Sequence, residues 1–236
     1  MRLLSKGDLL NIFGGDYAIH SLPADFAGAA RESIVYEPDI LIIGEYGEFR
    51  KRIFCVTHKS CAINDYYTNN PNVRHIHAVY KSSSSRDILV TTGDTAKFLD
   101  LWHMHNDKMV FRKRLKKYLA GHTAITEIGG KYYLGTDFSS RPNYIEELNG
   151  EKFFFPRDAY KMYVIGFYQY KKRYILSINH KIEDFGGQNT LSVFDVVTKK
   201  FIFCNSLGYI QKNTLNKELQ RTSKSVAKIR ALFACR

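Results

Sequence analysis

An internal repeat of strand pairs is the feature of this sequence that most limits its fold. Four segments share one pattern, in which an apolar stretch, a polar turn and a second apolar stretch follow one another; they begin at Ser33, His75, His122 and Tyr163. Each ends on a short polar signature: Gly44-Glu45, Gly93-Asp94, Thr136-Asp137 and Asn179-His180. The interval from Glu45 to Asp94 is 49 residues, that from Asp94 to Asp137 is 43 residues, and that from Asp137 to Asn179 is 42 residues. Strand-rich repeats with a period in the forties are typical of β-propeller blades.

The stretches between these segments supply the outer strands of each blade. Third strands are expected in KRIFCVTH, FLDLWHMH, PNYIEEL and NTLSVFDVV, and fourth strands in MVFRKRL, EKFFFP and KFIFC. The N-terminal LLSKGDLLNIF has the pattern of an outer hairpin, and SLGYIQ could add an inner strand, so that the two chain ends would close a further blade. Ring closure of this kind removes exposed sheet edges. We therefore predict an all-β fold, a β-propeller of about five four-stranded blades, with four or six blades as alternatives.

Length and composition agree with one large all-β domain. A chain of 236 residues can bury a full core, and its 16 Tyr and 16 Phe favour strands. No apolar run approaches the roughly 18 to 20 residues of a membrane span, and Lys6 and Asp8 interrupt the N-terminal segment where a secretory signal would be apolar. The four cysteines lack C-x-x-C spacing, which favours reduced thiols. We predict a propeller over residues 1–210 of a cytoplasmic protein.

The C-terminal residues 211–236 differ in character from the rest of the chain. The formal charge of the protein is +12, and nine Lys or Arg residues between Lys199 and Arg236 stand against one acid, Glu218. Apolar residues recur there at helical spacing, at Leu215, Leu219, Val226, Ile229 and Phe233. This pattern predicts a basic amphipathic helix that docks on the propeller. The alternative is attachment to an anionic membrane surface, which would make the protein peripheral to the membrane. We do not expect a nucleic-acid partner.

Two histidines in the segment RHIHAV provide the first candidate site. His75 and His77 are two residues apart in an expected strand, so their side chains should lie on one face. The first strand of each blade lines the central channel of a propeller, and this face would therefore look toward the axis. The same arrangement would bring polar residues together from several blades: Arg74 and His122 at first strands, and Glu45, Tyr46, Asp94, Asp137 and His180 at the ends of second strands.

Several short motifs occur in a defined order between residues 33 and 204: GEY, HIHAV, DILVTTGD, LWHMHND and YYLGTDFSSRPNYI. This order resembles the sialidase-like β-propellers, often called BNR or Asp-box repeat glycosidase-like proteins. The resemblance implies a propeller that acts on or recognises carbohydrate, here a bacterial-type polysaccharide. The chain departs from the family pattern in two ways. Its Asp-boxes are degenerate, since VTHKSCAIN and WHMHNDKMVF lack the glycine of S-x-D-x-G-x-x-W, and no arginine set matches the three that hold a sialic acid carboxylate.

Three functions are compatible with this set of residues. The first is glycoside hydrolysis, which needs two carboxyl groups across the glycosidic bond; the catalytic residues would be Glu45, Asp94, Asp137 and His75, with Arg74, Tyr46, His122 and His180 binding substrate. The second is a propeller that binds glycan or protein without catalysis. The third is a cation-dependent polysaccharide lyase, in which His75 and His77 would hold a divalent cation.

Each of these residues also has a purely structural interpretation. Two histidines in one strand are commonly half-buried side chains with backbone partners. An acidic residue after glycine at a strand end commonly caps nearby N–H groups. The histidines do not recur in every repeat, however, whereas a residue needed only for the architecture would tend to recur. This difference favours the functional interpretation.

Overall fold

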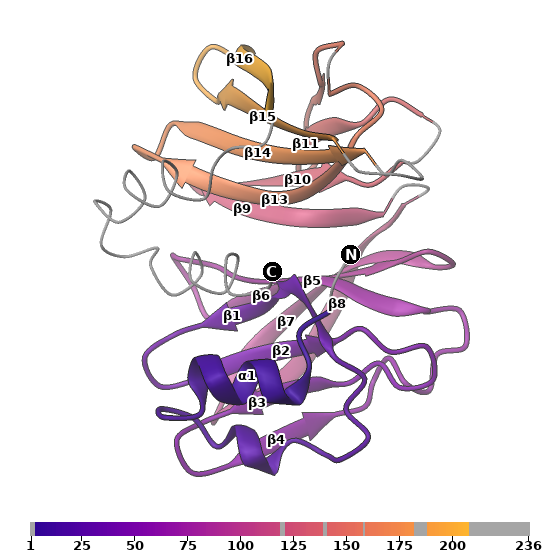
Figure 1. Cartoon of the computed structure of the whole chain (residues 1–236), viewed down its shortest axis with the longest axis vertical. Helices are drawn as coiled ribbons and strands as arrows, with labels where there is room; N and C mark the ends of the chain where they lie inside the picture. The colour runs from indigo at the N-terminus through magenta and orange to yellow at the C-terminus, as the bar shows by residue number, and fades with distance from the viewer. Residues whose placement is uncertain (1–2, 119–120, 139–140, 158, 182–187, 208–236) are drawn as a thin grey trace.

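The computed structural model describes residues 3–118, 121–138, 141–157, 159–181 and 188–207 (Figure 1). These residues form four antiparallel sheets of four strands each, and in every sheet the strands follow one another in chain order. Such units are the blades of a β-propeller. The prediction of an all-β propeller is therefore confirmed. The described residues form four blades, which is one of the two alternative counts, and they do not support the preferred count of about five.

The blades follow one another along the chain. Blade 1 contains β1 (Ala29–Tyr36), β2 (Leu41–Glu45), β3 (Ile53–Val56) and β4 (Cys61–Asn64). Blade 2 contains β5 (His75–Lys81), β6 (Asp87–Gly93), β7 (Lys97–His105) and β8 (Lys108–Tyr118). Blade 3 contains β9 (His122–Ile128), β10 (Lys131–Thr136), β11 (Tyr144–Glu147) and β12 (Lys152–Phe154). Blade 4 contains β13 (Tyr163–Tyr170), β14 (Tyr174–Lys181), β15 (Gln188–Asp195) and β16 (Lys200–Leu207).

The first strands of the four blades surround one axis. β1 contacts β5, β5 contacts β9, and β9 contacts β13. Between the last blade and the first, a Cβ atom on Gly166 of β13 would lie 2.9 Å from Glu32 Oε1 of β1, so these strands also approach each other closely. Figure 1 shows β1, β5, β9 and β13 near the middle of the molecule, with β4 and β16 toward opposite ends. The ends of the first strands are consequently neighbours, although they are far apart in sequence.

Apolar side chains between successive blades form the core. Buried clusters join blades 1 and 2, blades 2 and 3, and blades 3 and 4. Glycine allows the closest approaches, because a Cβ atom on Gly44 of β2 would lie 2.7 Å from Ile76 of β5, and one on Gly135 of β10 would lie 2.6 Å from Val164 of β13. In blade 2, Thr91 Oγ1 instead donates a 2.7 Å hydrogen bond to the carbonyl of His122 in β9. The second strand of each of these blades thus contacts the first strand of the next.

The N-terminal segment is a helix and not the outer hairpin that the sequence suggested. α1 (Lys6–Phe13) begins with a capping box, in which Ser5 and Asp8 each accept a hydrogen bond from the other's backbone. Leu9 and Phe13, four residues apart, share one face of the helix and pack with Leu41 and Phe54 of blade 1. A short 3-10 helix (Ile19–Ser21) follows. Capping and i, i+4 packing therefore place this segment on blade 1, where Leu4 forms an isolated antiparallel bridge with Ala29 of β1 in place of the expected hairpin.

The other half of the expected fifth blade is also not observed. Ser206 and Leu207 of SLGYIQ belong to β16, the fourth strand of blade 4, and the residues after Leu207 lie outside the described residues. The predicted amphipathic helix over residues 211–236 lies outside them too. Within the part of the chain that the structure describes, no helix has the length and apolar character needed to cross a membrane.

The close contact between blades 3 and 4 gives a stability prediction. In a Gly135→Ala variant the new methyl group would meet Val164 and Phe167 at 2.6 and 2.7 Å. Overpacking of this kind typically costs about 1–3 kcal/mol. Urea unfolding of this variant should therefore show a lower free energy of unfolding than the wild type. Gly15→Ala is the control, since no atom lies within 4 Å of its added Cβ. Equal stability of the Gly135→Ala variant and the wild type would contradict the packing described between these blades.

Candidate functional site

His75 and His77 lie at the beginning of β5, and a β-bulge determines how they are presented. His75 pairs with Gly93, Ile76 pairs with Thr92 and Ala78 pairs with Thr91, so His77 is an extra residue in the ladder. Bulges re-aim side chains and are frequent next to functional sites. The two imidazole rings are 5.8 Å apart and nearly parallel, at 16°. The prediction that both side chains share one face is confirmed.

The same irregularity occurs in the other blades. In blade 3 the register of β9 and β10 shifts between Gly135 and Thr136, which leaves Thr123 unpaired, and in blade 4 the register shifts around Ile165. A longer irregularity interrupts β1 after Ala29. Every blade therefore has a disturbed ladder near the start of its first strand. Only blade 2 places a histidine at this position.

Asp94 contacts both histidines. It follows the last residue of β6 and has a positive φ of 67°, which turns the chain away from the sheet. Its Oδ2 accepts a hydrogen bond from His75 Nε2, and its Oδ1 lies 3.8 Å from His77 Nε2. The side chain is 40% exposed, whereas His75 and His77 are buried. Asp94 is therefore the part of this cluster that reaches solvent.

Asp137 occupies the equivalent position in the next blade and approaches His77 from its other nitrogen. Asp137 Oδ2 lies 3.4 Å from His77 Nδ1. This distance is slightly longer than a hydrogen bond, and neither His77 Nδ1 nor Asp137 Oδ1 has a hydrogen-bond partner among the described residues, although both atoms are buried. The His77 ring is thus located between two carboxylates from different blades.

Tyr46 of blade 1 covers the two imidazoles. Its ring stacks on His75 at 4.0 Å and 15°, and it is nearly parallel to the His77 ring at 5.9 Å and 7°. Burial raises the pKa of Tyr46 to about 12, and the negative charges of Asp94 and Asp137 add to this effect. The phenol consequently stays protonated near neutral pH. Three blades contribute to the cluster of Tyr46, His75, His77, Asp94 and Asp137, which we call the His-Asp cluster.

Two glycines allow the side chains of the His-Asp cluster to pack this closely. A Cβ atom on Gly93 would lie 1.8 Å from the His77 ring, and one on Gly121 would lie 2.5 Å from the Asp137 carboxylate. Neither distance is compatible with a larger residue unless the ring or the carboxylate moves. In the sequence, Gly93 is recognisable only as a turn residue, and no pattern points to Gly121. Because both pack against partners from other segments, sequence spacing alone gave no signal for this role.

The environment of the cluster favours neutral His77 and ionised Asp94. Burial lowers the pKa of His77, and the charges of Asp137 and Asp94 only partly oppose this effect. The hydrogen bond from His75 lowers the pKa of Asp94, and the neighbouring His77 contributes further. An ionised, partly exposed carboxylate therefore lies beside a buried imidazole that favours its neutral form.

Arg74, predicted to bind substrate, lies beside Asp94 at the exposed edge of the His-Asp cluster. Its Nη1 is 3.8 Å from Asp94 Oδ2, and its Nη2 is 3.6 Å from Glu48 Oε1. The Arg74 side chain is about half exposed. An anionic group that approaches from solvent could therefore contact this guanidinium.

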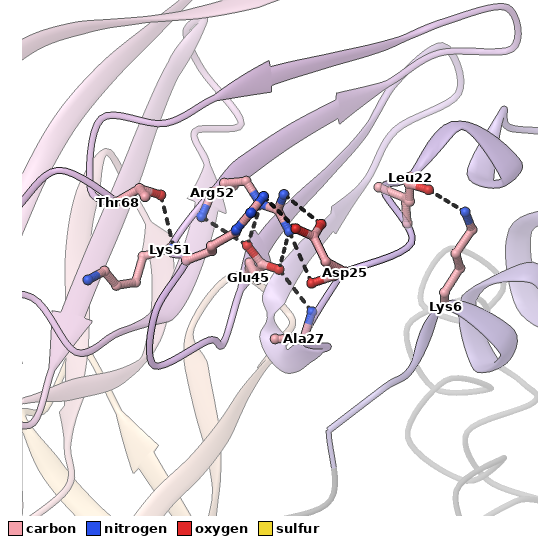
Figure 2. Close-up of polar contacts among 9 residues, drawn as sticks. Lys6, Leu22, Asp25, Ala27, Glu45, Lys51, Arg52 and Thr68 are labelled. Atoms are coloured by element: carbon pink, nitrogen blue, oxygen red, sulfur yellow. Dashed lines mark hydrogen bonds and ion pairs between the residues drawn. The ribbon is translucent and has the colours of Figure 1, made fainter.

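Glu45 is buried in a separate ion pair (Figure 2). Its carboxylate accepts hydrogen bonds from Arg52 Nε at 2.7 Å and Arg52 Nη2 at 2.8 Å, and from the backbone N–H of Ala27 at 2.9 Å. Arg52 in turn donates to Asp25 Oδ1 at 3.0 Å. Glu45 is fully covered and its carboxylate oxygens are engaged, so it is not in a position to contact a substrate. Sequence reasoning did not identify Arg52 as its partner.

His122 and His180 have their main contacts outside the His-Asp cluster. His122 is buried at the start of β9, with its Nε2 3.6 Å from Glu146 Oε2, and Lys116 Nζ lies 2.8 Å from Glu146 Oε1. The charge of Asp137 is close enough to act on the pKa of His122. His180 Nδ1 lies 2.8 Å from Asn189 Oδ1 within blade 4. The structure thus joins His122 to the edge of the His-Asp cluster through Asp137 and places His180 in a pair within its own blade.

No protein-family model matches this chain, and no curated protein matches it. Two imidazoles and a carboxylate lie together, with one ligand atom from each of His75, His77 and Asp94 within 4.8 Å of the others. This donor set is suited to proton transfer or to binding a cation.

Loss of the Glu45 partner should destabilise the fold. Arg52→Met keeps an apolar side chain of similar length but leaves the buried Glu45 carboxylate without its cation. Removal of one member of a buried ion pair typically costs about 3–5 kcal/mol, and denaturant unfolding should show a loss of this size. Arg50→Met is a matched control, because Arg50 pairs with the same Asp25 at the surface and its side chain is 57% exposed. A loss from Arg50→Met as large as that from Arg52→Met would contradict the structural role given to Glu45.

The buried His122 gives a pH prediction. Burial lowers its pKa below the model-peptide value of 6.5, against the opposing charges of Glu146 and Asp137, while Lys116 acts in the same direction as burial. Below pH 6.5 the unfolded chain therefore binds more protons than the folded one, and the free energy of unfolding should fall as the pH is lowered from 7 toward 5. His122→Gln should reduce this fall, measured by urea unfolding at several pH values. An unchanged pH dependence would show that His122 is not held neutral.

Proposed function

We propose that the protein is a carbohydrate-acting β-propeller that takes an acidic polysaccharide at the exposed edge of the His-Asp cluster. The observation that carries this proposal is the convergence of Tyr46, His75, His77, Asp94 and Asp137 from three blades at one end of the first strands. The order of motifs that resembles the sialidase-like propellers supports carbohydrate as the ligand class. Arg74, half exposed beside Asp94, supports an acidic sugar, because a guanidinium can bind a carboxylate in bidentate fashion.

Among the reaction classes, the geometry favours elimination over hydrolysis by two carboxylates. Glu45 is engaged by Arg52, so Asp94 and Asp137 are the remaining pair of the predicted acids. The His77 ring lies between them, with one carboxylate near each nitrogen. A hydrolase needs the scissile bond in the gap between its two carboxyl groups, and here an imidazole occupies that gap. A lyase needs instead a cation or arginine at the sugar carboxylate, a base for the proton on the adjacent ring carbon and a proton donor for the leaving oxygen. The cluster offers the imidazole of His75 as the base, and the protonated Tyr46 could provide the proton donor.

Binding without turnover is the second candidate function. Its supporting observation is the burial of both histidines, which are only 6% and 5% exposed. A sugar could then contact Asp94 and Arg74 at the surface without reaching a base. The two candidates share the ligand class and the location, and they differ in whether a product is released.

A panel of acidic and neutral polysaccharides tests the proposal. The full chain should either release products or be retained on at least one acidic glycan. Ultraviolet absorbance of an unsaturated uronate would identify a lyase, new reducing ends without this absorbance would identify a hydrolase, and retention without product would identify a binding propeller. No retention and no product with any member of the panel would contradict a carbohydrate function.

The variant Asp94→Asn tests the location of the site. Loss of a charged hydrogen bond of about 1.5–3 kcal/mol should lower retention or turnover by about tenfold or more. Asp87→Asn is the matched control, because Asp87 lies at the other end of β6 and also pairs with a histidine, at 3.1 Å from His103 Nδ1. Similar losses from both variants would place the ligand elsewhere.

A further inference from the structure

We propose that His75, His77 and Asp94 bind one divalent transition-metal ion of the zinc type. This inference goes beyond the proposed carbohydrate function and does not depend on it, since a metal could bind here whatever the ligand of the propeller is. The three residues offer one ligand atom each, and these atoms lie within 4.8 Å of one another. One Asp94 carboxylate oxygen lies beside Nε2 of each imidazole, so the carboxylate is next to a possible ligand nitrogen of both histidines.

The distances require only a small closure around an ion. With bonds of about 2.1 Å and tetrahedral angles, two ligand atoms on one zinc ion are roughly 3.4 Å apart. The present upper limit of 4.8 Å therefore exceeds this by little more than an ångström. Asp94, the exposed member of the set, can move toward such an ion, and the two imidazoles would also have to approach each other slightly. The hydrogen bond between His75 Nε2 and Asp94 Oδ2 would be replaced by two bonds to the metal.

The donor types indicate the class of metal. Two imidazole nitrogens and one carboxylate oxygen suit zinc and its neighbours among the first-row divalent ions, whereas magnesium and calcium prefer oxygen ligands alone. Three protein ligands leave at least one position for water or for an oxygen of a bound molecule. That position would lie toward Asp94 and solvent.

A second observation points independently to a ligand at this place. His77 is buried, its Nδ1 has no hydrogen-bond partner among the described residues, and the Asp137 carboxylate lies 3.4 Å from this atom. Metal-binding histidines usually direct the second ring nitrogen at a carboxylate in this way, because the carboxylate fixes the tautomer and makes the ligand nitrogen more basic. With the proton on Nδ1, His77 Nε2 would carry the lone pair that faces Asp94.

Tyr46 favours metal binding at this site, whereas the positive charge of Arg74 opposes it. Tyr46 stacks on His75 and lies parallel to His77, which restricts both rings to one orientation. Arg74 brings a positive charge to 3.8 Å from Asp94 and opposes a cation. Its half-exposed side chain also lies near Glu48, 3.6 Å away, and can move toward that carboxylate when Asp94 binds an ion.

Metal analysis of the full chain tests the proposal. The purified protein is stripped with a chelator, incubated with Zn²⁺, desalted and assayed for bound zinc. We expect one ion per chain in the wild type and loss of that ion in His77→Ala and Asp94→Asn. Asp137→Asn should weaken zinc affinity by about 10- to 100-fold, as is typical for the carboxylate partner of a ligand histidine. Co²⁺ in place of zinc should give the visible absorption of a nitrogen- and oxygen-ligated site, and this absorption should be absent in the ligand variants.

His103→Ala is the matched control for these variants. His103 also pairs with an aspartate, at 3.1 Å from Asp87 Oδ1, but lies outside the cluster. It should bind zinc as the wild type does. Circular dichroism and denaturant unfolding of each metal-free variant establish that lost binding does not reflect lost folding. A wild-type protein that retains no more zinc than the folded His77→Ala variant would overturn the proposal, as would an equal loss in His103→Ala. The glycan panel is measured separately, so failure of the carbohydrate function and failure of the metal site are distinguishable.

Discussion

The packing of four first strands around one axis is the constraint on which the rest of this structure depends. Each blade can bury its faces only against its neighbours, and glycine at Gly44 and Gly135 lets the first strand of the next blade approach. The ring closes where Gly166 in the first strand of blade 4 lies close to Glu32 in the first strand of blade 1. Since the ends of these strands must then crowd together, any polar residue at those ends becomes a neighbour of polar residues from other blades. The His-Asp cluster is a direct result of this crowding.

Local irregularity in the first strands decides which side chains meet. A regular ladder would alternate its residues strictly between two faces, whereas the bulge at His77 re-aims that residue within an otherwise paired strand. The residues directly after the paired ends of β2, β6 and β10 are Tyr46, Asp94 and Asp137, and these three approach the two histidines. A common architecture therefore supplies equivalent positions, and different residue types at those positions make an asymmetric site.

The repeat pattern predicted the blades because it depends on local alternation, but it did not determine exact register. The repeat pattern aligns Glu45 with Asp94 and Asp137. In the structure Glu45 pairs with Ala29 of the first strand, just as Gly93 pairs with His75, so Glu45 is equivalent to Gly93 and not to Asp94. A shift of one residue moves a side chain to the other face of a strand, which explains why Glu45 pairs with Arg52 inside blade 1. Partners such as Arg52 and Gly121 could not be predicted from spacing, since their contacts depend on how separate segments pack in space.

Hydrogen-bond satisfaction distinguishes the buried Glu45 from the buried atoms of His77 and Asp137. Glu45 accepts hydrogen bonds from Arg52 and from Ala27, so its burial is compensated and needs no further partner. His77 Nδ1 and Asp137 Oδ1 are buried without such bonds among the residues that the structure describes. A buried polar atom left unpaired costs about 1–3 kcal/mol, which a fold built only for stability would avoid. The His-Asp cluster therefore carries a cost that the Glu45 ion pair does not, and this difference supports the function proposed for the cluster.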